Sequence, residues 1–137
     1  MILHMSNAAK VDAFLNKAGV FYFLTADGEQ PRGRPFGFHM LVGDRVYLGC
    51  GTFKNVFKEL TANPRVEVLA MAGEEFLRYD GKATVVKDEA LIAKVREIMP
   101  DIMALYDKNG WEMGLFYLEG GHAEIRGMMD LKEEFDV

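Results

Sequence analysis

The chain has little from which covalent cross-links or metal sites could be made. Its 137 residues include a single cysteine, Cys50, and three histidines, His4, His39 and His122. One thiol cannot form an internal disulfide, and three scattered imidazoles lack the ligand spacing of a zinc site. We therefore predict no metal site, a reducing cytoplasmic location, and a Cys50 that serves as a small buried apolar residue.

Long apolar runs and excess positive charge are also missing. No stretch approaches the ~20 consecutive apolar residues that a membrane-spanning helix needs. The N-terminal segment MILHMSNAAK has neither the basic start nor the apolar run of a signal peptide. The formal net charge is -5, so nucleic acid and anionic lipid would repel the chain on average. We predict no membrane and no nucleic-acid partner.

Apolar and aromatic residues, by contrast, are plentiful. Half of the chain is hydrophobic and 12% is aromatic, which is ample for one packed interior, and the length predicts a single domain over residues 1–137. So small a domain has limited interior in which to bury rings. The aromatic content therefore indicates a partner surface or a flat ligand.

Periodicity divides the chain into strands and short helices. Helical spacing predicts helices over residues 7–17 and 53–62, a third that Asp88 caps and Pro100 ends, and one or two further turns over 101–106. Alternation and turn signals predict strands over residues 20–27, 31–42, 45–50, 65–72, 75–87 and 113–127, with a solvated acidic tail, LKEEFDV. This order predicts an α+β domain built on a mainly antiparallel, closed or nearly closed β-barrel.

The start of the second helix breaks a local rule. Thr52 stands where an N-cap belongs, which puts Lys54 and Asn55 in the first turn and Lys58 one turn later. A cation at the positive end of a helix costs about 0.3–1 kcal/mol, and an anion bound to the first-turn N–H groups would reverse that sign. The pattern predicts either an anion site or two solvated lysines.

A second candidate lies in the segment PRGRPFG. Arg32 and Arg34 are two residues apart on a strand, so their side chains share one face and suit phosphate recognition. Pro35 and Gly37 face the other way, where a planar ring could approach the backbone. The alternative is an edge strand with solvated arginines.

Taken together, these segments resemble those of a known protein family. The GEQPRGRPF strand, the Thr-x-Lys-Asn helix start and the NPRVEV strand, in this order, resemble the FMN-binding split-barrel family typified by pyridoxamine 5'-phosphate oxidase. The similarity is greatest to the short bacterial oxidase-related members and extends over residues 19–127. It implies a split barrel and a homodimer with FMN in the groove between two subunits.

The resemblance also implies site residues. Arg34, Thr52 and Lys54 match phosphate contacts, and Tyr117 of a second subunit matches an aromatic side chain beside the flavin ring. The expected cofactor-binding set is Arg32, Arg34, Pro35, Phe36, Gly37, Gly51, Thr52, Lys54, Asn55, Trp111 and Tyr117. Trp111 is either a cover for the core or part of a ligand lid, and His39 either a structural residue or a ligand contact.

The function implied is transfer of electrons or hydride to or from a small molecule. The flavin supplies that chemistry, so no catalytic acid or base is named. The full oxidase has basic residues near its C-terminus that hold pyridoxamine phosphate, whereas this chain has LKEEFDV there. Pyridoxamine phosphate is therefore not expected as the substrate. The alternative function is a non-catalytic module that stores or senses a flavin, or holds haem or a deazaflavin.

Overall fold

A computed structural model describes residues 5–137. The first helix, α1 (Asn7–Ala18), begins where the Ser6 hydroxyl accepts a hydrogen bond from the Ala9 backbone N–H at 3.1 Å. It ends at Gly19, whose φ of 76° favours glycine. Val11 and Leu15 are fully buried, as the helical spacing predicted.

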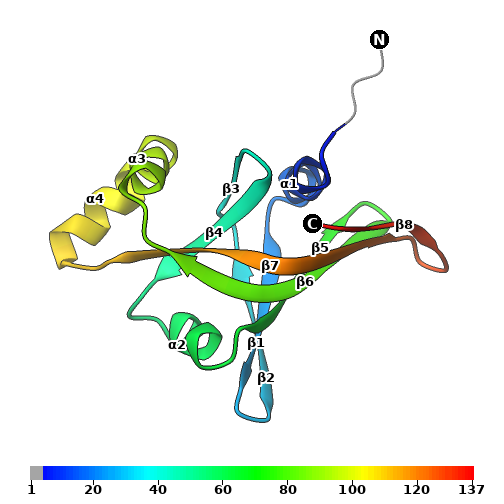
Figure 1. The fold of residues 1–137 in the computed structure, drawn as a ribbon, viewed down its shortest axis with the longest axis horizontal. Coiled ribbons are helices and arrows are strands. Elements are labelled where there is room, and N and C mark those ends of the chain that lie inside the picture. The colour runs from blue at the N-terminus through cyan, green and yellow to red at the C-terminus, as the bar shows by residue number, and fades with distance from the viewer. Residues whose placement is uncertain (1–4) are drawn as a thin grey trace.

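Eight strands form one antiparallel sheet in the order β2-β1-β5-β6-β7-β4-β3, with β8 paired to β7 (Figure 1). The strands are β1 (Phe21–Asp27), β2 (Gln30–Phe36), β3 (His39–Val42), β4 (Arg45–Gly51), β5 (Arg65–Ala72), β6 (Glu75–Val86), β7 (Met113–Arg126) and β8 (Leu131–Asp136). The predicted α+β class is confirmed. The sheet curves strongly but remains open between β2 and β3, so the barrel is split.

The prediction of one strand over residues 31–42 is wrong. The chain leaves the ladder after Phe36, and a new strand begins at His39. β2 pairs with β1, whereas β3 pairs with β4 at the opposite edge of the sheet. Alternation continues through the break, so the sequence pattern alone could not show the change of partner.

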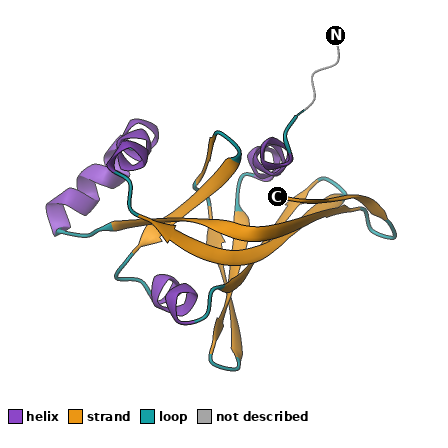
Figure 2. Ribbon diagram, in the orientation of Figure 1, coloured by secondary structure: helices purple, strands orange, loops and turns teal. Residues whose placement is uncertain are grey.

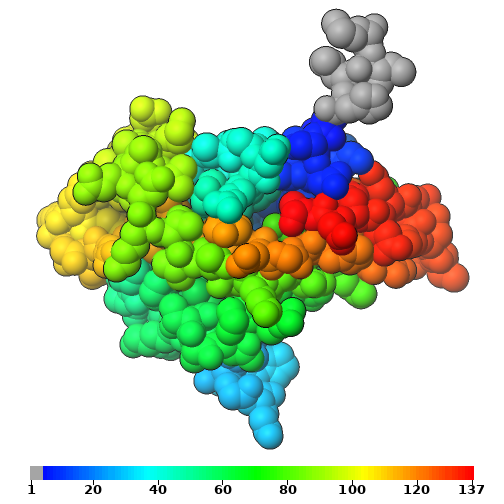
Figure 3. Space-filling view, viewed as in Figure 1, coloured from blue at the N-terminus to red at the C-terminus, as the bar shows by residue number. Residues whose placement is uncertain are grey.

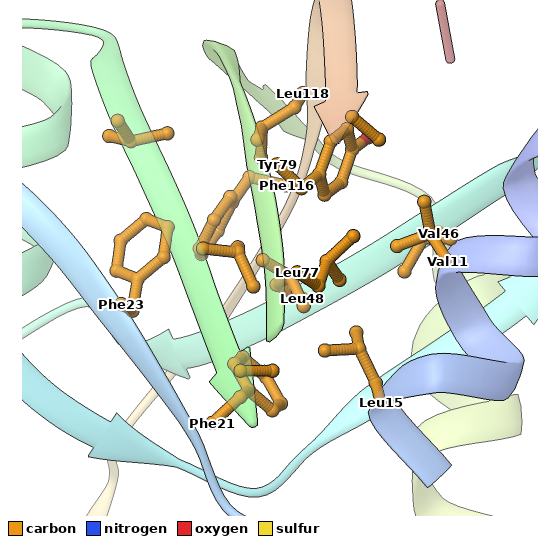
Figure 4. Packing of buried hydrophobic residues seen from close by; sticks show 14 of the residues in the cluster. Val11, Leu15, Phe21, Phe23, Val46, Leu48, Leu77, Tyr79, Phe116 and Leu118 are labelled. Atoms are coloured by element: carbon orange, nitrogen blue, oxygen red, sulfur yellow. The ribbon is translucent and has the colours of Figure 1, made fainter. Parts of the chain in front are cut away.

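The main core lies inside the curved sheet, where side chains from several strands converge (Figure 4). Phe21, Phe23 and Phe116 are fully buried, and the rings of Phe23 and Phe116 lie 5.3 Å apart. Val11 and Leu15 of α1 close this core from one side. Val56 and Leu60 of α2 (Asn55–Ala62) contribute from the other (Figure 1).

A second core covers the outer face of β3, β4 and β7. Helices α3 (Glu89–Ile98) and α4 (Pro100–Asn109) pack there through Leu91, Val95 and Met103. The two helices form a lobe beside the barrel (Figures 2 and 3). Asp88 caps α3, as predicted. Pro100 does not merely end that helix: it begins α4, because proline has the right φ for the first helical turn.

No helix within residues 5–137 is long and apolar enough to cross a bilayer.

The C-terminal segment LKEEFDV is mostly exposed, as predicted, but it also forms the strand β8, which the sequence pattern did not show. The strand pairs with β7 and is also bonded to α1. Asn7 Nδ2 donates to the Asp136 carbonyl at 2.8 Å, and Lys10 Nζ lies 2.5 Å from Glu133 Oε1. His122 of β7 contacts Asp136 at 2.9 Å and Glu134 at 3.2 Å. These charge pairs therefore allow the acidic strand β8 to pack against β7 and α1.

The acidic groups around His122 belong to an ion-pair network. Possible ligand atoms of His122, Glu124 and Glu134 lie within 4.8 Å of one another. Arg126 Nε, however, already donates to Glu124 at 2.8 Å. The Arg126 guanidinium therefore neutralises the Glu124 carboxylate. We infer that His122 and its acidic neighbours anchor β8 to β7.

This anchor predicts a pH dependence. Hydrogen bonds to Asp136 and then Glu134 raise the pKa of His122, so its contribution to stability is complete below the unfolded pKa and is lost as pH rises through the folded one. His122→Gln should therefore lower the melting temperature more at about pH 5.5 than at about pH 8.5. Lys10→Met is the control, because its charge is constant over that range. An equal loss at both pH values for His122→Gln would contradict the assignment.

Candidate functional site

The first turn of α2 is open to an anion. Helix α2 begins at Asn55, with Lys54 as its N-cap, and no side chain among residues 5–137 caps it. No acidic residue lies in the first turn. The backbone N–H groups there and the Lys54 ammonium together favour a negatively charged ligand.

The prediction that Thr52 caps this helix is wrong. The Thr52 N–H donates to the Glu112 carbonyl at 3.0 Å, which ties the segment to the start of β7. The Lys54 N–H then donates to the Gly51 carbonyl at 3.0 Å and closes a turn. The helix can therefore begin only after Lys54, two residues later than the sequence pattern indicated.

Arg34 is held in a partly buried network beneath this turn. Its Nη1 donates to the Phe23 carbonyl at 3.2 Å and to Thr25 Oγ1 at 2.8 Å, and its Nη2 donates to Glu59 Oε1 at 2.6 Å. The Thr25 hydroxyl also donates to Glu59 at 2.6 Å. Hydrogen bonds from Thr25 and then Arg34 lower the pKa of Glu59. The Arg34 guanidinium is therefore oriented before any ligand binds.

The charges of Arg34 and Lys54 both act at the end of β4. Burial raises the pKa of Cys50 to about 11, while the charges of Lys54 and then Arg34 oppose that rise. A charge acts noticeably on a thiol only at short range. Arg34 is bonded to Glu59 of α2 and Lys54 is the N-cap of the same helix, while Thr52 lies between Cys50 and Lys54 in the chain.

Other members of the predicted set lie elsewhere on β2. Arg32 is half exposed and pairs with Asp27 at 3.4 Å, near the turn of the β1–β2 hairpin. The Phe36 ring stacks on Phe23 at 5.0 Å, so this side chain belongs to the core and only its backbone faces outward. Pro35 and Gly37 are exposed. They leave the outer surface of this strand accessible to a ring.

Two glycines at the site are required by local packing. A Cβ on Gly51 would lie 2.5 Å from the Phe53 ring, and one on Gly114 would lie 2.5 Å from the Phe57 ring. A Cβ on Gly37, in contrast, would meet nothing within 4 Å. Gly51 therefore has a packing role, which the sequence pattern did not reveal.

A cavity of about 590 Å³ lies between the α3–α4 lobe and the barrel. Thr52 and Trp111, both in the predicted set, line it. The Trp111 ring is 4.6 Å from the Phe53 ring and 5.7 Å from the Tyr106 ring, yet 39% of the residue remains exposed. Trp111 thus covers the second core and also forms part of the cavity wall.

Sequence reasoning missed most of this cavity. Residues of α3 and α4 such as Ile92, Arg96, Met103 and Asp107 line it. Their helical spacing indicated only that one face of each helix is apolar. Nothing in the local pattern could show that the two helices would dock on β7 and leave a space beside Thr52.

Asn55 and Tyr117 do not line this cavity, and they lie in two different pockets. Asn55 lies in a groove of about 340 Å³ with Lys58 and Glu59. Tyr117 borders a small cavity of about 190 Å³, and the Arg45 guanidinium carbon lies 3.9 Å from its ring centre. One chain therefore does not assemble the full predicted set.

The aromatic content predicted a partner surface or a flat ligand, but the GLFYL segment of β7 offers little surface for either. Leu115, Phe116 and Leu118 are almost completely buried in the chain's own cores. Only Tyr117 is half buried. A long strand with a core on each face absorbs apolar residues at consecutive positions, which a one-core barrel would leave exposed.

The donor set fits a phosphate monoester. β4 leads through Thr52 to the uncapped helix start at Lys54, and the pre-oriented guanidinium of Arg34 is bonded to the same helix. Phosphate groups bind helix N-termini and form strong charge-assisted hydrogen bonds with basic side chains. Phe53 stands between Thr52 and Lys54 in the chain, and its ring lies 4.6 Å from the ring of Trp111.

Comparison with known proteins agrees with the fold. The sequence profile of the family described as Pyridoxamine 5'-phosphate oxidase matches residues 8–118. No curated protein matches the chain. A NimC/NimA family protein from Clostridium acetobutylicum is similar in structure, with a TM-score of 0.86 and 26% identity, over 97% of this chain and 95% of that one.

More distant structures share the fold alone. A haem-binding protein from Mycobacterium smegmatis has a TM-score of 0.68 and 14% identity, over 98% of this chain and 60% of that one. PhzG from Burkholderia lata, in complex with tetrahydrophenazine-1-carboxylic acid, has a TM-score of 0.60 and 14% identity, over 94% and 86% of the two chains.

Proposed function

Because this chain belongs to the pyridoxamine 5'-phosphate oxidase family, we propose that it binds FMN and transfers electrons or hydride to or from a small molecule. The family commonly binds flavin or haem and includes oxidases. The observation that carries the proposal is the uncapped start of α2, where Lys54 and Arg34 supply positive charge. When bound, the flavin supplies the redox chemistry, and the protein binds and orients it.

Each residue near the start of α2 has a part in holding the phosphate. Lys54 supplies a mobile ammonium, and the Thr52 hydroxyl supplies a donor on the same turn. Arg34 uses three of its five N–H donors within the chain, so two remain for a ligand. Its bonds to Glu59 and Thr25 reduce the entropy lost when it binds phosphate.

Haem is the second candidate cofactor of this family, and the described histidines do not support it. His39 lies 2.6 Å from Asp12 and is nearly buried, while both ring nitrogens of His122 contact acidic side chains. Neither histidine lines the cavity beside Thr52. Histidine is a common axial ligand of haem, so this arrangement favours flavin.

We also propose that two copies form a homodimer with FMN between them. Val20, Tyr22 and Met71 are each more than half exposed. Tyr22 lies on β1, opposite Pro35 of β2 and Leu69 of β5, so the outer face of these strands offers apolar surface to a second copy. Tyr117, which does not line the cavity beside Thr52, would then reach the flavin of the other copy.

Titration with FMN and riboflavin tests the proposal. FMN should bind at one per chain and at least tenfold more tightly than riboflavin, which lacks the phosphate. Sedimentation should show a dimer that FMN strengthens, because ligand binding and association are linked. Equal affinity for both flavins would refute the phosphate site. A stable monomer that binds FMN tightly would refute the shared groove.

A further inference from the structure

The cavity beneath the α3–α4 lobe has the character of a small-molecule site. Its volume of about 590 Å³ falls within the roughly 300–1,000 Å³ of typical ligand pockets. Apolar side chains form much of its lining, namely Phe57, Val85, Val86, Ile92, Met103, Trp111 and Met113. Of the residues that hold the proposed phosphate, Thr52 alone lines it. The cavity is therefore adjacent to the cofactor's phosphate site and separate from it.

The charged residues of the rim are predominantly acidic. Asp107 is already neutralised by Arg96, whose two Nη atoms donate to it at 2.6 and 3.0 Å. Asp88 accepts hydrogen bonds from the first-turn N–H groups of α3. Three other charged residues line the cavity and form no ion pair within residues 5–137, namely Lys87, Glu89 and Glu112.

The excess of negative charge at the rim disfavours the binding of anions. Recognition of a phosphate or carboxylate requires convergent basic donors. The one guanidinium in the lining, that of Arg96, is already engaged by a carboxylate. The carboxylates of Glu89 and Glu112 outnumber the single ammonium of Lys87, so the net charge of these groups would attract a cation at the rim and repel an anion. An aromatic ring could pack on Trp111 and the apolar floor.

We propose that this cavity is a subsite for a small, unphosphorylated aromatic amine. That the bound amine is the substrate rests on the proposed flavin function, whereas the binding of the amine to this cavity does not. The apolar lining takes the ring, and Glu89 and Glu112 attract the ammonium. A phosphorylated amine of the pyridoxamine phosphate type is rejected, because the same carboxylates repel its phosphate.

The chain contains a built-in reporter for the experiment. Trp111 is the only tryptophan and lines the cavity, so occupancy should change the intrinsic fluorescence. FMN-free protein would be titrated with benzylamine, benzyl alcohol and benzyl phosphate, with calorimetry as a second measurement. We expect saturable binding, with benzylamine tightest, the alcohol weaker, and benzyl phosphate at least tenfold weaker than benzylamine.

Charge variants separate recognition of the amine from simple burial of the ring. Glu112→Gln and Glu89→Gln should each bring the affinity for benzylamine towards that for benzyl alcohol, and leave the alcohol unchanged. Glu29→Gln is the matched control, because Glu29 is exposed in the β1–β2 turn and does not line the cavity. Unchanged amine preference in both cavity variants would overturn the assignment of the ammonium site.

Three other outcomes would overturn the proposal. These are benzyl phosphate binding as tightly as benzylamine, no saturable binding of any probe, and displacement of benzylamine by FMN, which would assign the cavity to the cofactor. The flavin titration is independent of these results. Benzylamine binding without FMN binding would refute the flavin function alone, and the reverse result would refute the amine subsite alone.

Discussion

Replacing Lys54 by alanine is expected to weaken FMN binding by about 1.5–3 kcal/mol, the value of a lost hydrogen bond between charged groups. In dissociation constant this is roughly 10- to 150-fold. Lys54 stands at the uncapped start of α2 and forms no ion pair with residues 5–137. Its removal should therefore leave the melting temperature of the FMN-free protein nearly unchanged. Calorimetric titration of the variant with FMN and riboflavin measures both affinities.

Lys58→Ala is the matched control for Lys54→Ala. It removes the same charge one helical turn later, where Lys58 lines the groove beside Asn55. A solvated charge at that distance should contribute little, and less at high salt. Affinity for riboflavin should be nearly constant in both variants. If Lys54→Ala weakened riboflavin and FMN equally, the lysine would act on local folding and not on the phosphate.

Arg34→Ala should have two separate effects, of which the larger is on stability. The change removes the partner of Glu59, whose side chain is 11% exposed, and one partner of the buried Thr25 hydroxyl. Leaving a partly buried carboxylate and a hydroxyl without their donor costs about 2–4 kcal/mol. Urea unfolding should show this loss in the FMN-free protein, and the loss of FMN affinity should come in addition.

A triple variant separates the two roles of Arg34. Arg34→Met and Glu59→Met replace the ion pair by apolar groups of similar length, and Thr25→Val removes the buried hydroxyl that both side chains bond. The triple variant should therefore unfold near the parent's urea midpoint and still bind FMN weakly. Recovery of FMN affinity along with stability would show that Arg34 supports the fold and does not contact the phosphate.

The sequence predicted the main features of the fold because they depend on local patterns. The first helix, predicted over residues 7–17 and found at 7–18, and the cap at Asp88 were both identified from short segments. The break between β2 and β3 was missed, because alternation persists while the pairing partner changes. The strand β8 was missed because its acidic residues are compensated by Lys10 and His122, which lie far away in sequence.

The candidate site remains a prediction whose two signals were local. The lysine at the start of a helix was visible as a violation of electrostatic preference, and the arginine as one of a pair on one face of a strand. The engagement of Arg34 by Glu59 and Thr25 was not, since it depends on how α2 docks against β1. The cavity also requires the α3–α4 lobe to be in place. Residue type therefore supported the hypothesis of a phosphate ligand, and tertiary packing determined which groups remain available to test it.

The position of β2 at the edge of the sheet limits how two copies can meet. Pro31 and Pro35 lie on this edge strand, on either side of Gly33. Proline has no N–H, so two potential donors along the edge are missing. Such an edge resists growth of a continuous intermolecular sheet, and with it the fibrous aggregation to which open β structures are prone. In the proposed homodimer, contacts through this region would therefore be made by side chains between sheet faces.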